Sequence, residues 1–425
     1  MTDKPHALDL VRTPKLDPSA KPWYRYYAGF SPNFVDDMCN TLGVEAGVPT
    51  LDPWMGSGTT LSVAAGRGAA VAGLDLNPVM IAVARGRLLA RDTITSLNPL
   101  GLEVVASWKA RSLVHDPLRA WFDEPTAAQI RGLSRRIQRM FIGKQSTSYI
   151  DIRHASSLAC FFLIGLFDVV SAAVRAYGSR NPTWIKGTGG ADGVVRMSKA
   201  DIVSAYLAAI RRLSSHLQFT RAIETDVHDL AQLRLGDSRS LPFKDSSFDV
   251  VLSSPPYLTR LDYAMGHAPE LAVLGYGASE LRSLRSAMIG TPTRSDEKTE
   301  EPLGEVAVNL LDQVAEHGSY AASTYYEPNF RQYFVGMASS FRELERVTSP
   351  GGQIALVVQD SRFKEIHLDL AGALTGMAET RGWATRGRKD FVNVRSMAQL
   401  NKRAHPVAQK TKPTESVICF ELPKG

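Results

Sequence analysis

The 425-residue sequence is poor in cysteine and lacks the marks of several protein classes. Its three cysteines, Cys39, Cys160 and Cys419, are odd in number and far apart, so they predict neither a disulfide framework nor a metal cluster. The first residues, MTDKPHALDLVRTPKLDP, contain no apolar stretch typical of a secretory signal. We therefore expect a cytoplasmic chain without a metal site.

Long hydrophobic runs are scarce, and no internal repeat or low-complexity tract is visible. Residues 157–174 form a stretch apolar enough to raise the question of a membrane span. Asp168 interrupts this stretch and no second one accompanies it, so we expect a buried helix and no membrane partner. With 44% apolar and 22% charged residues, the composition is that of a soluble globular protein.

Charge is distributed unevenly along the chain. There are 49 Lys and Arg against 43 Asp and Glu, a net charge of +6, but residues 101–220 alone hold 16 against 8. A basic block in a nearly neutral chain is typical of a surface that faces a polyanion, although a solvated helical face produces the same pattern. The densest run is 131-RGLSRRIQR-139, and residues 391–413 form a second basic stretch.

Strand-like and helix-like segments alternate in the order of an α/β protein. The pattern predicts about seven strands in one doubly wound sheet, with a large helical insertion between the second and third strands. The strands are expected near 48–52, 70–75, 231–237, 248–254, 353–360, 383–395 and 415–421, and the helices of the insertion near 103–121, 127–142, 149–177 and 199–222. Further helices are expected from Pro32 and near 59–68, 328–346 and 365–381.

These segments suggest three regions. Residues 1–20 form an N-terminal tail, residues 21–91 and 221–425 form the main domain, and residues 92–220 form the inserted, basic, helical region.

A glycine turn, 51-LDPWMGSGTT-60, lies between a predicted strand and a predicted helix. Gly56 and Gly58 permit a tight turn and a close approach of the backbone to a ligand. A nicotinamide fingerprint needs a third glycine where Leu61 stands, and the lysine of a phosphate-binding loop is absent. Asp75 ends the next strand, where an acid can accept hydrogen bonds from both hydroxyls of a ribose. The turn therefore favours a nucleoside ligand.

A second motif follows the strand 248–254, which runs into Ser254-Pro255-Pro256-Tyr257. This position is the carboxyl end of a strand, where open α/β sheets bind ligands. Proline has no N–H and a fixed φ, so the turn offers rigid acceptors without adjacent donors. A flat substrate with an amino group would find acceptors in the Ser254 hydroxyl and the Pro255 carbonyl, and a stacking face in Tyr257.

Such a site needs no covalent nucleophile and no metal. Hydrogen bonds to the N–H groups of an aromatic amine can draw it toward tetrahedral geometry, and positioning beside an activated electrophile supplies much of the acceleration. Serine is a weak base at neutral pH, so we assign Ser254 to orientation and leave the proton acceptor open.

The two motifs together resemble those of a known family. The string Asp-Pro-x-x-Gly-Ser-Gly-Thr-Thr resembles the S-adenosylmethionine-binding motif of the DNA amino-methyltransferases, which use a seven-stranded Rossmann-like fold. The family also has an aromatic stretch before Ser-Pro, and Tyr26, Phe30, Ser31 and Pro32 match it. Ser-Pro-Pro-Tyr is most similar to the motif of cytosine-N4 enzymes, whereas adenine-N6 enzymes more often begin it with Asp or Asn. Methylation at carbon 5 of cytosine would need a cysteine that normally follows a proline, whereas the three cysteines follow Met, Ala and Ile. The resemblance covers about 21–91 and 228–422.

The resemblance implies S-adenosylmethionine as cofactor and transfer of its methyl group to the exocyclic N4 amine of a flipped cytosine. The backbone near Gly56 and Gly58 would hold the methionine part, Asp75 the ribose and Asp237 the adenine amino group, with Leu76 and Pro78 beside the ring. The expected catalytic residues are Ser254, Pro255, Pro256 and Tyr257. The expected cofactor-binding residues are Tyr26, Phe30, Ser31, Pro32, Asp52, Pro53, Gly56, Ser57, Gly58, Thr59, Thr60, Asp75, Leu76, Asn77, Asp237 and Ser238.

Double-stranded DNA is the partner that the resemblance implies, and a basic surface would be needed to hold it. We expect the insertion to contribute to target recognition, and we expect His154 and His267 to be packing or surface residues. A cognate restriction endonuclease in the same system and the oligomeric state both stay open. Alternative functions are an adenine-N6 enzyme, an RNA or protein amino-methyltransferase of the same fold, and a non-catalytic DNA-binding module. The expected DNA contacts are Arg131, Arg135, Arg136, Arg139, Lys402 and Arg403.

Overall fold

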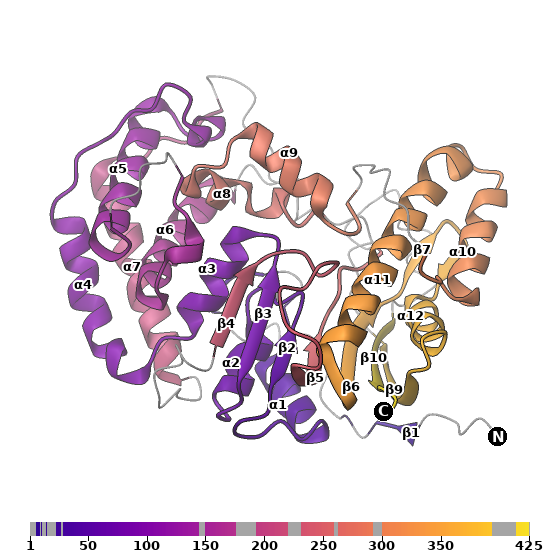
Figure 1. Ribbon diagram of the computed structural model, residues 1–425. Helices are drawn as coiled ribbons and strands as arrows, with labels where there is room; N and C mark the ends of the chain where they lie inside the picture. Colours follow the sequence, from indigo (N-terminus) through magenta and orange to yellow (C-terminus); the bar gives the residue numbers. More distant parts are fainter. Residues whose placement is uncertain are drawn as a thin grey trace.

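The computed structural model describes most of the chain. The described residues are 6–8, 10, 14, 23–26, 29–143, 149–175, 193–219, 231–258, 262–291, 300–392 and 414–424. They form a central sheet with a helical body on one side and a smaller group of helices on the other (Figure 1).

The sheet confirms the predicted α/β class. Its order is β1-β9-β10-β6-β5-β2-β3-β4, and every pairing is parallel except those of β10 with β6 and with β9. All seven predicted strands are present in this sheet. The two-residue strand β1 forms one edge of the sheet and was not predicted. The bounds are β1 (His6–Ala7), β2 (Thr50–Asp52), β3 (Val71–Asp75), β4 (Ala231–Leu235), β5 (Phe248–Ser253), β6 (Thr348–Gln359), β9 (Ala384–Val392) and β10 (Thr414–Glu421).

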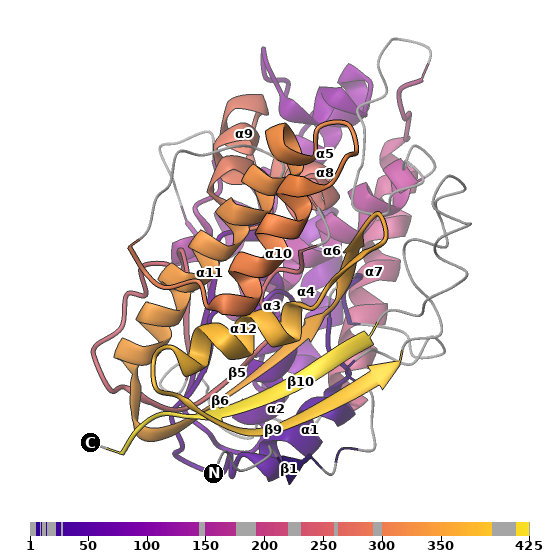
Figure 2. The same cartoon turned by 90° about the vertical axis from the view of Figure 1, so that its right-hand side faces the viewer.

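Side chains of each central strand alternate between two hydrophobic clusters. In β6, Ala355 and Val357 belong to the cluster shared with the helical body, whereas Ile354, Leu356 and Val358 face the second cluster. This period of two is the geometric property of a strand, and it shows that both faces of the sheet are covered. Figure 2 shows α12 crossing one face of β6, β9 and β10. The helices of the second cluster are α10 (Glu305–Glu316), α11 (Glu327–Val347) and α12 (Leu370–Glu379).

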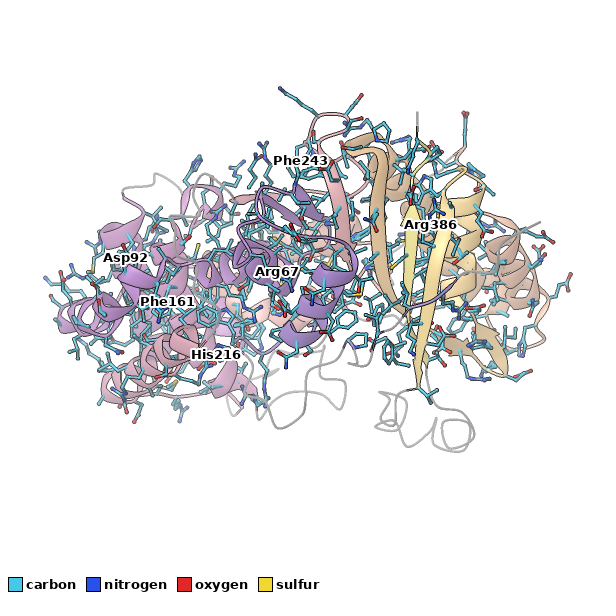
Figure 3. The ribbon with its side chains drawn as sticks, turned by 90° about the horizontal axis from the view of Figure 1, so that it is seen from below. Arg67, Asp92, Phe161, His216, Phe243 and Arg386 are labelled. Carbon is cyan, nitrogen blue, oxygen red and sulfur yellow. The ribbon has the colours of Figure 1, made fainter. Side chains whose placement is uncertain are left out.

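The helical body has α6 at its centre. This helix contacts α3, α5, α7 and α8, and Phe161 and Phe162 are fully buried. By length and composition α6 could cross a membrane, but 67% of it is buried inside the protein, as predicted for a core helix. Seen from below, Phe161 and His216 lie within this body (Figure 3). Helices α1 to α7 have the following bounds: α1 (Pro32–Thr41), α2 (Thr59–Ala65), α3 (Pro78–Arg87), α4 (Ile94–Ala106), α5 (Glu124–Phe141), α6 (Ser157–Val174) and α7 (Lys199–Phe219).

The insertion is packed against the sheet layer through one shared core. Residues of α3 and of α4 to α7 belong to the same hydrophobic cluster. Two helices that follow the Ser-Pro-Pro-Tyr motif, α8 (Ala268–Leu274) and α9 (Ala278–Ala287), lie above the sheet beside the insertion (Figure 1). The helical side of the molecule therefore extends beyond the 92–220 region expected from the sequence.

Two predicted helices have different bounds in the structure. Instead of a helix at 103–121, α4 ends at Ala106 and an extended stretch follows, because Ser107 adopts β geometry. The helix expected from 365 begins only at Leu370, after a hairpin of β7 (Ser361–Phe363) and β8 (Ile366–Leu368). Short hairpins without a long hydrophobic alternation give a weak pattern, so these two strands were missed.

Candidate active site

A pocket lies at the carboxyl edge of the sheet, beside the ends of β2, β3, β4 and β5. Its empty volume, including the part open to solvent, is about 920 Å³. The two motifs meet in this pocket although about two hundred residues separate them in the sequence. The side chain that joins them is Ser253, whose hydroxyl donates a short hydrogen bond to Asp52.

Most of the predicted site residues line this pocket. Gly56 and Gly58 lie behind its wall in the turn, and Ser31 and Pro32 begin α1 outside it. Lining residues that were predicted are Tyr26, Phe30, Asp52, Pro53, Ser57, Thr59, Thr60, Asp75, Leu76, Asn77, Asp237, Ser238, Ser254, Pro255, Pro256 and Tyr257.

The glycine turn depends on two residues in the left-handed region. Gly56 has a φ of +48° and Gly58 a φ of +73°, which favour glycine over other residues. A Cβ on Gly56 would lie 2.6 Å from the Tyr26 ring, and one on Gly58 would lie 2.6 Å from the Cβ of Ala84. The turn can therefore adopt this conformation, packed against Tyr26 and Ala84, only with glycine at both positions. Arg87 holds it from below by donating to the Ser57 carbonyl and the Thr59 hydroxyl.

Two carboxyl groups line the cofactor end of the pocket. Asp75 accepts hydrogen bonds from the N–H groups of Gly56 and Asn77, one on each oxygen, so each oxygen keeps a lone pair for a ligand. Burial raises the pKa of Asp75 to about 6 and that of Asp52 to about 7, against the lowering effect of their hydrogen bonds. Both groups therefore change charge near neutral pH.

The expected adenine end of the pocket is lined by predicted residues and by residues that were not predicted. Asp237 lines it, and its carboxylate also accepts hydrogen bonds from Arg239 at 2.6 to 3.1 Å. Leu76 lines the pocket, whereas Pro78 is buried at the first turn of α3 and does not. Met288 and Ile289, at the end of α9, provide apolar surface in this pocket instead.

The Ser-Pro-Pro-Tyr turn is held by hydrogen bonds from several elements. The Ser254 hydroxyl has two acceptors for its single proton, the Val357 carbonyl at 2.9 Å and Tyr257 Oη at 3.2 Å. Tyr333 donates to the Pro256 carbonyl at 2.8 Å, whereas no hydrogen bond to the Pro255 carbonyl is found within the described part of the chain. The Ser254 oxygen and the Pro255 carbonyl thus keep acceptor capacity on a fixed turn.

Tyr257 is fixed by a residue that the sequence analysis missed. Its hydroxyl donates to Glu415 Oε1 at 3.2 Å, and Glu415 is 2% exposed at the start of β10. Burial, followed by the charge of Glu415, raises the pKa of Tyr257 well above its usual value. The tyrosine is therefore neutral at physiological pH.

Several other lining residues were not predicted. Trp54, Met55 and Met80 belong to the cofactor segments, and Tyr263 follows the catalytic turn. His267, expected to be a packing or surface residue, is buried and lines the pocket, where its ring stacks near Tyr26 with 5.9 Å between centroids. The position of Trp54 could have been used to predict it, because it lies inside the glycine motif between the predicted residues Pro53 and Gly56. For His267 the sequence contained no such signal.

The chemistry of the pocket fits S-adenosylmethionine. Asp75 lines the pocket and offers two acceptors for neighbouring hydroxyls. The indole Nε1 of Trp54 is buried without a hydrogen-bond partner in the described residues, so a ligand acceptor could satisfy it. Asp75, Trp54 and Ser57 of the glycine turn would hold the cofactor.

The predicted DNA contacts on α5 differ in exposure. Arg131 is 1% exposed and forms an ion pair with Asp116 at 2.8 Å, so the prediction that it contacts DNA is wrong. Its guanidinium also donates to the carbonyls of Ala272 and Val273 at the end of α8. Arg135 and Arg136 are half-buried and Arg139 is exposed. Lys402 and Arg403 lie outside the described residues.

Comparison with known proteins gives relatives of one kind. No family model matches the chain. It is 22% identical over 413 residues to the type II methyltransferase M.BsoBI of Geobacillus stearothermophilus, covering 85% of this chain and 78% of that protein. It is 27% identical over 153 residues to the type II methyltransferase M.AvaI of Nostoc sp., covering 33% of this chain and 32% of the relative.

Solved structures give a weaker likeness. The rRNA methyltransferase AviRa from Streptomyces viridochromogenes matches 95% of this chain and 88% of its own at 13% identity, with a TM-score of 0.31. The similarity to M.BsoBI extends over most of both chains, and the sheet and pocket agree with it. The chain is therefore a methyltransferase related to the type II methyltransferases, and S-adenosylmethionine is its methyl donor.

Proposed function

We propose that the chain is a site-specific DNA methyltransferase that methylates the exocyclic N4 amine of cytosine. The observation that carries the proposal is the environment of Ser254 in the pocket. Its proton has acceptors in Val357 and Tyr257, so the oxygen keeps lone pairs for an incoming N–H. Serine at this first position resembles the cytosine-N4 motif.

Two acceptors on one rigid turn suit a planar amine. The lone pair of such an amine is delocalised into its ring, and hydrogen bonds from both N–H groups to Ser254 Oγ and the Pro255 carbonyl would favour tetrahedral geometry. S-adenosylmethionine, when bound, supplies an electrophilic methyl group. The chain's contribution is to hold the amine in line with that group and to exclude water. The Tyr257 ring lines the same pocket and offers a stacking face.

Carbon-5 chemistry receives no support from the cysteines. All three are buried, and none of them lines the pocket. Burial raises the pKa of Cys160 and of Cys419 to about 12, so these thiols are protonated at neutral pH.

A duplex substrate requires a flipped base and a basic surface beside the pocket. We propose that Arg139, exposed on α5, contributes a phosphate contact and that the insertion of residues 92–220 contributes to target recognition. Replacing Arg139 with Met should weaken DNA binding and reduce the slope of log affinity against log salt by about one. Fluorescence anisotropy with labelled duplex at several salt concentrations measures this slope. An unchanged slope would remove Arg139 from the interface.

Incubation with labelled S-adenosylmethionine tests the proposed substrate. Mixed duplex DNA, transfer RNA and ribosomal RNA are offered separately, and the product nucleosides are identified by mass spectrometry. We expect label in N4-methylcytosine from DNA, and none with the variant Ser254→Ala. Label in N6-methyladenine would correct the target base, and label in RNA with DNA blank would replace the substrate class.

A further inference from the structure

A buried carboxylate lies directly behind the catalytic turn. Glu415 is 2% exposed and accepts the hydroxyl proton of Tyr257 at 3.2 Å, although 158 residues separate the two in the sequence. It is not part of the pocket lining, and it contacts the lining residue Tyr257. It is the second residue of β10, where it pairs with Gln359 of β6 and with Phe391 of β9.

Glu415 lies where an ionised carboxyl group is energetically unfavourable. The next residues on the same face of β10, Val417 and Cys419, are buried in the hydrophobic cluster of the helical body. Transfer of an ionised group into such surroundings costs several kcal/mol unless hydrogen bonds compensate. A glutamine has the same size and could accept the same bond from Tyr257. Simple support of the tyrosine therefore does not require an ionisable group here.

The hydroxyl groups form a continuous path toward this carboxylate. Ser254 Oγ lies 3.2 Å from Tyr257 Oη as a donor, and Tyr257 Oη lies 3.2 Å from Glu415 Oε1 as a donor. Each group can therefore pass its own proton onward as it receives one. The path begins at Ser254, which lines the pocket, and ends at a group that does not.

Amine methylation creates a need for such a path. When the new N–C bond forms and the C–S bond of the donor breaks, the nitrogen becomes positively charged and must lose one N–H proton. A serine is too weak a base to keep that proton. We propose that Glu415 is the terminal proton acceptor of the methylation, reached through Ser254 and Tyr257, and this proposal rests on the proposed function.

The proton balance is complete within the chain. The amine proton moves to Ser254 Oγ, the Ser254 proton moves to Tyr257 Oη, and the Tyr257 proton moves to Glu415, which becomes neutral. Ser254 and Tyr257 end in the state in which they began. The strongly raised pKa of Tyr257 agrees with a neutral relay and not with a stored tyrosinate. Glu415 acts as a positioning residue in the sense that it works through Tyr257 and does not contact the substrate.

The test compares Glu415→Gln with the native chain. Glutamine keeps the shape and the acceptor for Tyr257 but cannot take a proton. The expected result is a single-turnover methyl-transfer rate about a hundredfold lower, while the affinity for S-adenosylhomocysteine, followed by tryptophan fluorescence, stays within about twofold and thermal unfolding is unchanged. Glu415→Asp, which retains an ionisable group on a shorter stem, should recover part of the rate. Glu421→Gln, the same change on the same strand at an exposed ion pair with Arg386, is the matched control.

A native rate in Glu415→Gln overturns the proposal, because a structural role needs no proton acceptor. If that variant binds the cofactor poorly or fails to fold, Tyr257→Phe provides the test, because it interrupts the path but keeps the aromatic ring. A slow methyl-transfer rate with cofactor affinity retained supports the path. A native rate overturns it. The double variant should be no slower than the slower single variant, since both interrupt one path. The proposed function fails separately, when the native chain labels no DNA at all.

Discussion

At the scale of single residues, the cofactor end of the site depends on backbone angles that few residues adopt. Gly58 has a φ of +73°, and the Ala84 backbone leaves no room for a Cβ beside it. Asp75 meets the backbone of this turn through the N–H of Gly56 at 3.0 Å. A change in the turn therefore reaches Asp75, the proposed ribose-binding acceptor, directly.

Gly58→Ala should lower the free energy of unfolding by about 1–3 kcal/mol, because it combines left-handed strain with a close contact. It should also weaken S-adenosylhomocysteine binding. Urea denaturation and calorimetric titration measure the two effects. Gly43→Ala is the control, since Gly43 has a φ of +66° and nothing within 4 Å of an added Cβ. Equal losses in both variants would show that the contact with Ala84 has no consequence.

The carboxyl group of Asp75 predicts a pH dependence of cofactor binding. Its pKa is raised to about 6 by burial, so the group becomes protonated as the pH falls below that value. A protonated carboxyl offers fewer acceptors to a ribose, so the affinity for S-adenosylhomocysteine should fall by up to about tenfold per pH unit below pH 6 and level off above it. Titration calorimetry between pH 5 and pH 8 measures this. Asp75→Asn should bind weakly and lose the inflection, whereas an unchanged profile in this variant would refute the assignment.

At the scale of elements, Arg131 connects the insertion to the catalytic domain. It extends from α5, pairs with Asp116 and closes the end of α8 through two carbonyl groups. A buried cation with this number of bonds fixes how α5 and α8 meet. The sequence could not distinguish it from the other arginines of the same run, because burial depends on the neighbouring helix.

Arg131→Met should reduce the free energy of unfolding by about 3–5 kcal/mol, since it leaves the Asp116 carboxylate buried without its partner. Chemical denaturation measures the loss. Arg139→Met, on the same helix but exposed, should change the same quantity by less than about 0.5 kcal/mol. Similar values for the two variants would contradict the structural role of the Arg131 ion pair.

The sequence predicted some elements well and others poorly for physical reasons. The strands β5 and β6 contain apolar runs, the glycine turn follows β2 directly and Ser-Pro-Pro-Tyr follows β5 directly, so both motifs could be placed at the carboxyl edge. The β7 and β8 hairpin has three residues per strand and no clear period. Glu415 and His267 reach the site only through tertiary packing, so no local pattern could identify them.

At the scale of the whole molecule, the sheet brings the two motifs together, and the helical body packs against it in one hydrophobic cluster. The order of strands places β2 between β3 and β5, so the glycine turn lies between the ribose acceptor and the catalytic turn. The insertion, α8 and α9 lie on one side of this edge in Figure 1. Met288 and Ile289, which directly follow α9, line the pocket, so the helical side of the molecule contributes to its wall.

The central claim is the methylation of a cytosine amine in DNA, and base-resolution sequencing of DNA tests it most directly. DNA is taken from cells that express the chain and from cells that express Ser254→Ala, and modified bases are read together with their sequence context. The account predicts N4-methylcytosine within one recurring motif in the first sample and its absence in the second. N6-methyladenine in that motif, or identical unmodified DNA in both samples, would contradict it.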